Sequence, residues 1–159
     1  MVIAHALLQL FLRCAPGVGP VTMSALVAYE SDANPYAVGD NTDRRSYAPA
    51  GRAQAEELAL RLLRAGHRID VGYAQIDSDN FARLGIGPRE AFDDCTNVGA
   101  GARILTEDYA RAALRFGPGQ AALMHALSAY NTGGFWAGLG YARGVYASAA
   151  ALRFESDSR

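Results

Sequence analysis

The 159-residue sequence contains no lysine, and its fifteen basic residues are all arginines scattered along the chain. With sixteen acidic residues the formal net charge is −1. The chain therefore lacks the basic surface by which proteins bind nucleic acids or anionic membranes. It also lacks an apolar run long enough to cross a membrane as a helix. We expect neither a nucleic-acid partner nor a transmembrane segment.

Cysteine is scarce as well, since only Cys14 and Cys95 occur. No CxxC pair or Cys/His spacing is present, so no metal site is expected, and no cofactor is expected either. In an oxidising compartment the two cysteines would form one disulfide that closes a loop of about 80 residues. In a reducing compartment they would remain two buried thiols. The residues alone leave both alternatives open.

What the sequence does contain is the composition of a globular protein, with 50% hydrophobic and 19% charged residues. A chain of this length buries roughly 70% of its unfolded surface, and residues 1–159 are predicted to form a single domain. Residues 1–13 are either a remnant of a signal region or a first helix. The helix fits better, because no basic segment precedes the apolar stretch. Residues 155–159 are predicted to be a frayed polar tail.

Apolar residues recur at helical spacing along most of the chain. Helices are predicted over residues 2–12, 20–30, 55–65, 94–116, 120–130 and 141–152, with a short one that has Ser78 as its N-cap and closes at Gly85. Residues 36–51, rich in Asp, Asn, Pro and Gly, are predicted to form a long loop. Residues 69–76 alternate briefly and indicate a weak strand. The predicted fold class is mainly α, with a small extended or β element near residues 67–77.

Glu30 is the residue that best indicates chemistry, because it shares one helical face with Met23, Leu26 and Val27. Loss of solvation raises the pKa of a carboxyl group, which can then keep a proton near neutral pH. Such a group can give that proton to a leaving oxygen, as a general acid does. The alternative is a glutamate near a helix end whose carboxylate reaches water.

Other polar side chains interrupt apolar segments, and each has an ordinary explanation. Ser31 can bond a backbone carbonyl, and Gln75 can be a solvated loop amide. Tyr130 can be a core residue with a satisfied hydroxyl. Asn131 can end a helix, because asparagine tolerates the left-handed conformation. Singly, these signals are weak.

Taken in order, these segments resemble the goose-type-lysozyme-like lytic transglycosylases. The matching motifs are Glu30-Ser31, Gly72-Tyr73-Ala74-Gln75-Ile76 and Ala129-Tyr130-Asn131-Thr132-Gly133. The chain is more similar still to the small members attached to type IV secretion and conjugation systems. That closer likeness rests on residues 14–16, 34–39, 66–72, 92–97 and 101–105, and the resemblance covers roughly residues 7–147.

The resemblance implies a lysozyme-like α+β fold that cleaves the β-1,4 bond between N-acetylmuramic acid and N-acetylglucosamine in peptidoglycan, leaving a 1,6-anhydro end. Glu30 would be the sole catalytic acid/base, and Ser31 would fix the end of its helix. The substrate's acetamido group would replace the second carboxylate of ordinary glycosidases. Asp70 and Asp77 are accordingly expected to be structural or rim residues.

The resemblance also implies substrate-binding residues. Tyr130 would orient the catalytic acid, while Gln75 and Asn131 would bind N-acetyl and hydroxyl groups of the sugars. Tyr73 would lie along the floor of the groove. Trp136, together with Tyr36, is a candidate for stacking on sugar faces.

Cys14 and Cys95 match two cysteines typical of the subgroup, which implies a disulfide and a periplasmic or cell-envelope location. The implied partners are peptidoglycan strands and components of the secretion or conjugation machinery, although no export signal is evident. Where the family has Gly-Leu-Met-Gln, this chain has Tyr73-Ala74 before its glutamine, and Asp77 adds a negative charge. We expect the Tyr73-Ala74 pair to alter the groove wall. A hydrolytic muramidase and a weakened glycan-binding scaffold of the same fold are the alternatives.

Overall fold

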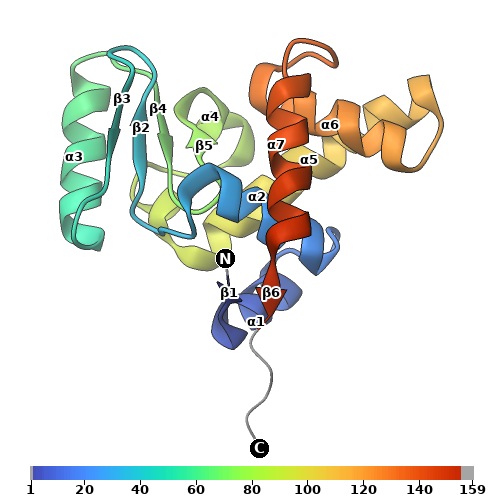
Figure 1. The fold of residues 1–159 in the computed structure, drawn as a ribbon. Coiled ribbons are helices and arrows are strands. Elements are labelled where there is room, and N and C mark those ends of the chain that lie inside the picture. Colours follow the sequence, from blue (N-terminus) through green and yellow to red (C-terminus); the bar gives the residue numbers. More distant parts are fainter. Residues whose placement is uncertain (1, 155–159) are drawn as a thin grey trace, which may run out of the picture. The chain divides into compact units, whose positions relative to one another are not determined.

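The computed structural model describes residues 2–154 and is mainly α-helical with a small antiparallel sheet, as predicted (Figure 1). The chain forms two compact units. The first unit comprises the residues up to Tyr29 and those from Ala102 onward, and the second comprises Glu30–Gly101. No helix in the described part of the chain is long and apolar enough to cross a membrane.

The first unit is built mainly from helices. Its elements are β1 (Val2–Ile3), α1 (His5–Cys14), most of α2 (Pro20–Ser31), the later part of α5 (Asp94–Phe116), α6 (Gln120–Thr132), α7 (Leu139–Ala151) and β6 (Arg153–Phe154). Helix α6 packs against α7, and β1 pairs with β6 in parallel (Figure 1). The prediction of a helix from residue 2 is therefore wrong for Val2–Ile3, whose backbone pairs with a strand near the other end of the chain. The tail predicted at 155–159 lies outside the described residues.

Helix α2 is more enclosed than its sequence pattern indicated. Pro20 occupies the first turn, where the missing N–H costs nothing. All five residues from Met23 to Val27 are buried, including Ser24 and Ala25 off the predicted face. The helix is therefore surrounded on several sides as far as Val27, beyond which Tyr29 is exposed and Glu30 is half-buried.

Helix α5 matches the predicted bounds 94–116. Its inner face is buried at Val98, Ala102, Leu105 and Ala112, the positions expected from the 3.6-residue period. Gly117 follows the helix with a φ of +75°, a conformation that glycine adopts without strain.

The second unit contains a four-stranded sheet in the order β3-β2-β4-β5, with every neighbouring pair antiparallel. The strands are β2 (Val38–Asp40), β3 (Arg45–Tyr47), β4 (Ile69–Val71) and β5 (Ile76–Asp77). Helix α3 (Arg52–Arg64) runs beside the strands in Figure 1 and contacts β2 and β4. The prediction of one extended segment at 69–76 is confirmed for Ile69–Val71 and Ile76 and is wrong for residues 72–75, which form a turn between β4 and β5.

The prediction of a long loop over 36–51 is wrong, because this segment contains the β2–β3 hairpin. The Asp40 carboxylate holds the hairpin loop, accepting hydrogen bonds from the Thr42 and Asp43 N–H groups at 3.0 and 3.2 Å. Its other oxygen lies 2.8 Å from His67 Nδ1. Burial alone would raise the pKa of Asp40, but the hydrogen bonds from His67 and these N–H groups hold it below its usual value.

The short helix after β5 begins one residue earlier than predicted. Asp77, not Ser78, is the cap, since its carboxylate accepts from the Asp79 N–H of the 3₁₀ helix Ser78–Asn80. The Ser78 hydroxyl instead accepts from the Ile69 N–H. A single α-turn (Phe81–Leu84) follows and closes at Gly85 in the left-handed region, as predicted. A second 3₁₀ helix (Glu90–Phe92) precedes α5.

Both cysteines are disulfide-bonded. Because the chain has only two cysteines, the bond joins Cys14 at the end of α1 to Cys95 in the first turn of α5. The disulfide expected from the resemblance is confirmed.

Replacing both cysteines, Cys14→Ser with Cys95→Ser, should lower the free energy of unfolding by about 2–5 kcal/mol, because a long loop is no longer closed in the unfolded chain. Urea unfolding with and without dithiothreitol measures this. The reductant should destabilise the wild type and leave the double variant unchanged. A wild type that is equally stable in both buffers would contradict the prediction.

Candidate active site

Glu30 and Ser31 form the last turn of α2, and Ser31 ties that turn to another segment of the second unit. The Ser31 hydroxyl donates a hydrogen bond of 2.8 Å to the carbonyl of Tyr73. The residue directly after Glu30 is thus hydrogen-bonded to the turn that contains Gln75. A hydrogen bond from a serine hydroxyl to a backbone carbonyl is common. Here it also joins the end of α2 to the turn, as the proposed role of Ser31 would need.

The turn 72–75 joins β4 to β5 and needs an unusual backbone. Gly72 has a φ of +76° and Gln75 a φ of +46°, both in the left-handed region. A Cβ atom at Gly72 would collide with the amide of Asn97. Glycine is required here for its conformation and for its lack of a side chain.

Asn97 is the buried residue that holds this turn, a role that its sequence position did not predict. Its Oδ1 accepts from the Ala74 N–H at 2.8 Å, and its Nδ2 donates to the carbonyls of Val71 at 2.9 Å and Ala91 at 2.8 Å. Only 1% of the residue is exposed. A polar residue in the first turn of a helix is commonplace, so the sequence carried no signal for this role.

Gln75 is half-buried, and its amide is largely committed to the backbone. Nε2 donates to the carbonyls of Gly72 at 2.9 Å and Ala37 at 3.2 Å. Its Oε1 lies over Gly39, where a Cβ would stand 3.1 Å away. Both amide hydrogens are used, so a ligand that meets Gln75 meets an acceptor.

Tyr73 and Ala74 differ sharply in exposure. Tyr73 is half-buried, and burial, followed by the nearby Asp94 and Tyr36, raises the pKa of its phenol. The hydroxyl is therefore neutral at physiological pH and can donate. Ala74 is fully buried. The side chain of Ala74 therefore lies in the core, and the expectation that the Tyr73-Ala74 pair alters the groove wall stays a prediction.

The two nearby carboxylates have different surroundings. Asp77 is paired with the Arg68 guanidinium, with Nε 2.8 Å from Oδ2, in addition to its capping bond. Asp70 lies opposite Gly39 in the sheet, and its Oδ2 accepts from Asn41 Nδ2 at 2.9 Å. Burial raises the pKa of Asp70 to about 6, although the Asn41 bond opposes the shift.

Tyr130 and Asn131 belong to the first unit, in the last turn of α6, which extends two residues further than predicted. Tyr130 is half-buried and Asn131 is exposed. Gly133 ends the helix with a φ of +76°, and its N–H bonds the Ala129 carbonyl at 2.6 Å. The expected approach of Tyr130 to Glu30 stays a prediction.

The described residues contain one group with spacing suited to a metal ion, formed by Asp40, Asp43 and His67, whose ligand atoms lie within 4.8 Å of one another. Both oxygens of Asp40 already have partners, one in N–H groups of the hairpin loop and the other in the His67 ring. The hairpin explains the cluster, and we assign it a structural role.

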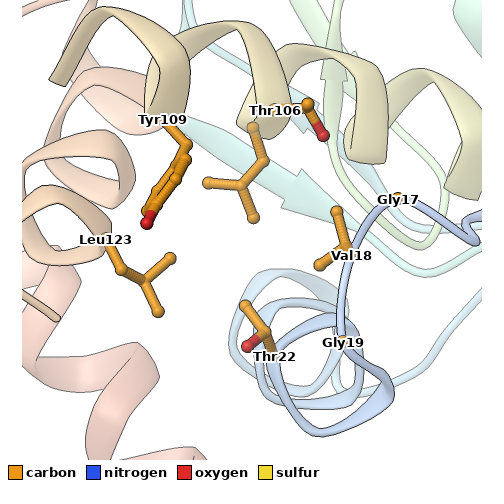
Figure 2. A pocket seen from close by; sticks show the side chains of 8 residues that line it. Gly17, Val18, Gly19, Thr22, Thr106, Tyr109 and Leu123 are labelled. Carbon is orange, nitrogen blue, oxygen red and sulfur yellow. The ribbon is translucent and has the colours of Figure 1, made fainter. Parts of the chain in front are cut away.

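A cavity of about 180 Å³ in the first unit is not a candidate for the chemistry. Figure 2 shows Tyr109 and Leu123 on one side of it, with Val18 and Thr22 on the other. The Tyr109 hydroxyl accepts from the Gly119 N–H at 2.9 Å. The lining offers no carboxylate or imidazole, so it holds no acid or base suited to general catalysis near neutral pH.

Asn97→Ala should lower the free energy of unfolding by about 2–4 kcal/mol, because it leaves three buried backbone groups without partners. Asn80→Ala is the matched control, since among the described residues the Asn80 side chain bonds only the exposed Arg83 side chain. Chemical denaturation of both variants measures the difference. Equal stabilities would show that the Asn97 amide does not hold the turn.

Asp70→Asn should change how stability depends on pH. The folded state, with an Asp70 pKa of about 6 against an ordinary value of 3.8, binds the proton more tightly than the unfolded chain. This residue's contribution to the free energy of unfolding therefore falls as the pH rises through that window. The substituted amide keeps an acceptor for Asn41 but carries no charge. The stability of the variant relative to wild type should rise over roughly pH 4–7 and then level off, and a constant difference would refute the assignment.

Comparisons with known proteins agree on one family. The chain is 40% identical over 142 residues to Protein virB1 of Agrobacterium fabrum, covering 88% of this chain and 58% of that protein. It is 38% identical over 142 residues to Protein virB1 of Rhizobium radiobacter, covering 88% and 59%. It is 38% identical over 127 residues to the type IV secretion system protein virB1 of Brucella abortus biovar 1, covering 79% and 53%.

The chain thus spans a little over half the length of these relatives. No solved structure gives a significant match. The family model described as Transglycosylase SLT domain matches residues 11–138, which include every candidate site residue named above. The chain belongs to the transglycosylase SLT domain family.

Proposed function

We propose that this chain is a peptidoglycan lytic transglycosylase that cleaves the β-1,4 bond between N-acetylmuramic acid and N-acetylglucosamine. The observation that carries the proposal is the Ser31–Tyr73 hydrogen bond, which joins the end of the Glu30 helix to the Gln75 turn. Two segments far apart in sequence, both part of the family resemblance, thereby come together in the second unit. Membership in the family supports the same activity.

In the first step, the Glu30 carboxyl group gives its proton to the glycosidic oxygen. The bond between that oxygen and the anomeric carbon of the muramic acid breaks, and the N-acetylglucosamine side leaves as an alcohol. The substrate's own acetamido group stabilises the positive charge that develops at the anomeric carbon. Glu30 is then a carboxylate, ready to accept a proton.

In the second step, the C6 hydroxyl of the muramic acid attacks the anomeric carbon and passes its proton to Glu30. The product is a 1,6-anhydro sugar, no water is consumed, and the acid is restored. Gln75 would accept a hydrogen bond from a sugar hydroxyl or N-acetyl N–H group. The proposed roles of Tyr73, Tyr130 and Asn131 are to hold the sugars and to orient the acid.

The proposed biological role is local opening of the cell wall for a type IV secretion or conjugation apparatus. Two of the relatives cited above are named Protein virB1 and one type IV secretion system protein virB1, which supports this role. The proposed location is the periplasm or cell envelope, where the Cys14–Cys95 disulfide would be stable. The proposed partners are peptidoglycan strands and components of that apparatus.

Glu30→Gln should lower the rate of release of muropeptides from purified sacculi by about 10²–10⁴-fold, because glutamine cannot transfer the proton. Glu57→Gln is the matched control, since Glu57 lies on α3 in the same unit and its side chain is 80% exposed. Mass spectrometry of the wild-type products should show 1,6-anhydro ends, one water lighter than reducing ends.

Two outcomes would contradict the proposal. Reducing ends among the wild-type products would assign a hydrolytic muramidase. Equal, low release by wild type and Glu30→Gln would assign a glycan-binding protein without turnover.

A further inference from the structure

An exposed cluster of aromatic and arginine side chains lies in the first unit, close in sequence to Asn131. We call it the Trp136 cluster, and it consists of Phe116, His125, Phe135, Trp136, Arg111 and Arg115. The cluster draws on the end of α5, the middle of α6 and the segment 133–138 that follows α6. The family resemblance implied only that Trp136 is a candidate for stacking on sugars, and none of the other side chains of the cluster has been given a role above.

The rings of the cluster support one another and leave Trp136 open. Phe116 and His125 are stacked with centroids 3.8 Å apart. The Trp136 ring meets them at steep angles, 68° to His125 at 4.6 Å and 85° to Phe116 at 5.6 Å. Even so, 57% of Trp136 is exposed. No described residue accepts a hydrogen bond from its indole N–H.

The segment that carries Trp136 is held in place from both ends. The Ser128 hydroxyl donates to the Gly134 carbonyl at 2.7 Å and accepts from the Gly138 N–H at 2.9 Å. Within the segment, the Phe135 carbonyl lies 2.8 Å from His125 Nδ1, which must donate the proton. The exposed ring is therefore fixed before any ligand arrives, and binding does not have to immobilise it.

Two guanidinium groups lie over rings of the cluster. Arg111 lies 5.4 Å from the centroid of Phe135, and Arg115 lies 5.5 Å from that of Phe116. Arg111 pairs with Asp108 at 2.6 Å, but its side chain is still 55% exposed. Arg115 has no carboxylate partner among the described residues. The cluster thus offers an aromatic face and positive charge side by side.

We propose that the Trp136 cluster is an accessory subsite for the peptidoglycan strand, in which Trp136 stacks on a sugar ring while Arg111 and Arg115 bind carboxylates of the same strand. A pyranose ring presents C–H groups that pack on an aromatic face. The muramic acid lactyl group and the stem peptides supply the carboxylates, which bind arginine through paired hydrogen bonds. This inference rests on the proposed function.

The chemistry of the cluster favours a glycan over a nucleic acid. An aromatic ring beside arginines can also stack on a base. A nucleic-acid groove, however, presents positive charge along many phosphates, whereas this chain has a net charge of −1 and the cluster has two arginines. A mixed ligand, with uncharged rings and spaced carboxylates, matches the cluster better.

Trp136 is the chain's single tryptophan, so intrinsic fluorescence reports on the proposed subsite alone. The experiment uses the full chain with Glu30→Gln, so that strands are not consumed, and titrates in chitohexaose or soluble uncleaved glycan strands that carry stem peptides. Both ligands should shift the emission to shorter wavelength as a sugar covers the ring. An unchanged emission at saturating ligand, or a tighter response to a single-stranded oligonucleotide, would overturn the proposal.

Sedimentation with purified sacculi tests the residues in the same Glu30→Gln background. Trp136→Ala should weaken binding about five- to tenfold, and Trp136→Phe should restore most of it. Leu114→Ala is the matched control, since Leu114 is 92% exposed on α5. If Trp136→Ala is folded by circular dichroism and binds like the Leu114→Ala control, the subsite is wrong.

The arginines are tested by the double change Arg111→Gln with Arg115→Gln. It should weaken binding to the peptide-bearing strands and reduce the salt dependence, while binding of neutral chitohexaose stays the same. Arg61→Gln on α3, with a side chain 66% exposed, is the control. If the double variant binds the charged strands as tightly as its parent, the two arginines do not belong to the subsite.

These outcomes are separable from the proposed function, because binding is measured without turnover. Anhydro products from the wild type together with unaffected binding by the Trp136 variants would sink the subsite and leave the enzyme assignment intact. Binding that is weakened by Trp136→Ala, together with no anhydro product from the wild type, would support the subsite and contradict the enzyme assignment.

Discussion

The side-chain amide of Asn97 makes three hydrogen bonds, all of them to backbone atoms of the second unit. Two of them fix the strand end at Val71 and the turn at Ala74, and the third reaches Ala91. The amide fills the space beside Gly72, so no side chain fits there, and glycine also permits the left-handed backbone of the turn. The same turn presents the Tyr73 carbonyl to Ser31 and holds Gln75. The anchoring of the Ser31 end of the candidate catalytic helix and the position of Gln75 therefore both involve the turn that this one buried side chain holds.

The helices could be predicted from the sequence because each repeats its apolar spacing several times. Helix α5 supplies six turns of evidence and was predicted with its observed bounds. The strands β2 and β3 have three residues each, which is too short for a period of two to show. Their hairpin is stabilised by Asp40, whose partner His67 lies 27 positions away. A contact between residues so far apart in sequence leaves no trace in the local pattern of either segment, so it could not be predicted.

In the candidate site, too, local features could be predicted from the sequence and features set by long-range contacts could not. Glu30 and Ser31 could be chosen because an acid and a hydroxyl end an apolar helix in a sequence order that resembles a known family. The direction of the Gln75 amide could not be predicted, because it is set by the Ala37 carbonyl, 38 positions earlier. The burial of Ala74 could not be predicted for a similar reason. Its neighbours in sequence are polar or aromatic, but the turn directs its methyl group into the core.

The small sheet has a consequence for the behaviour of the protein at high concentration. Its two edge strands are β3 and β5, of three and two residues. They carry Arg45 at one edge and the Arg68-paired Asp77 at the other. A second molecule that tried to extend the sheet would find few free backbone groups, flanked by charge. The sheet of one molecule is thus a poor template for the strands of another, so crowding should not lead to aggregation through sheet edges.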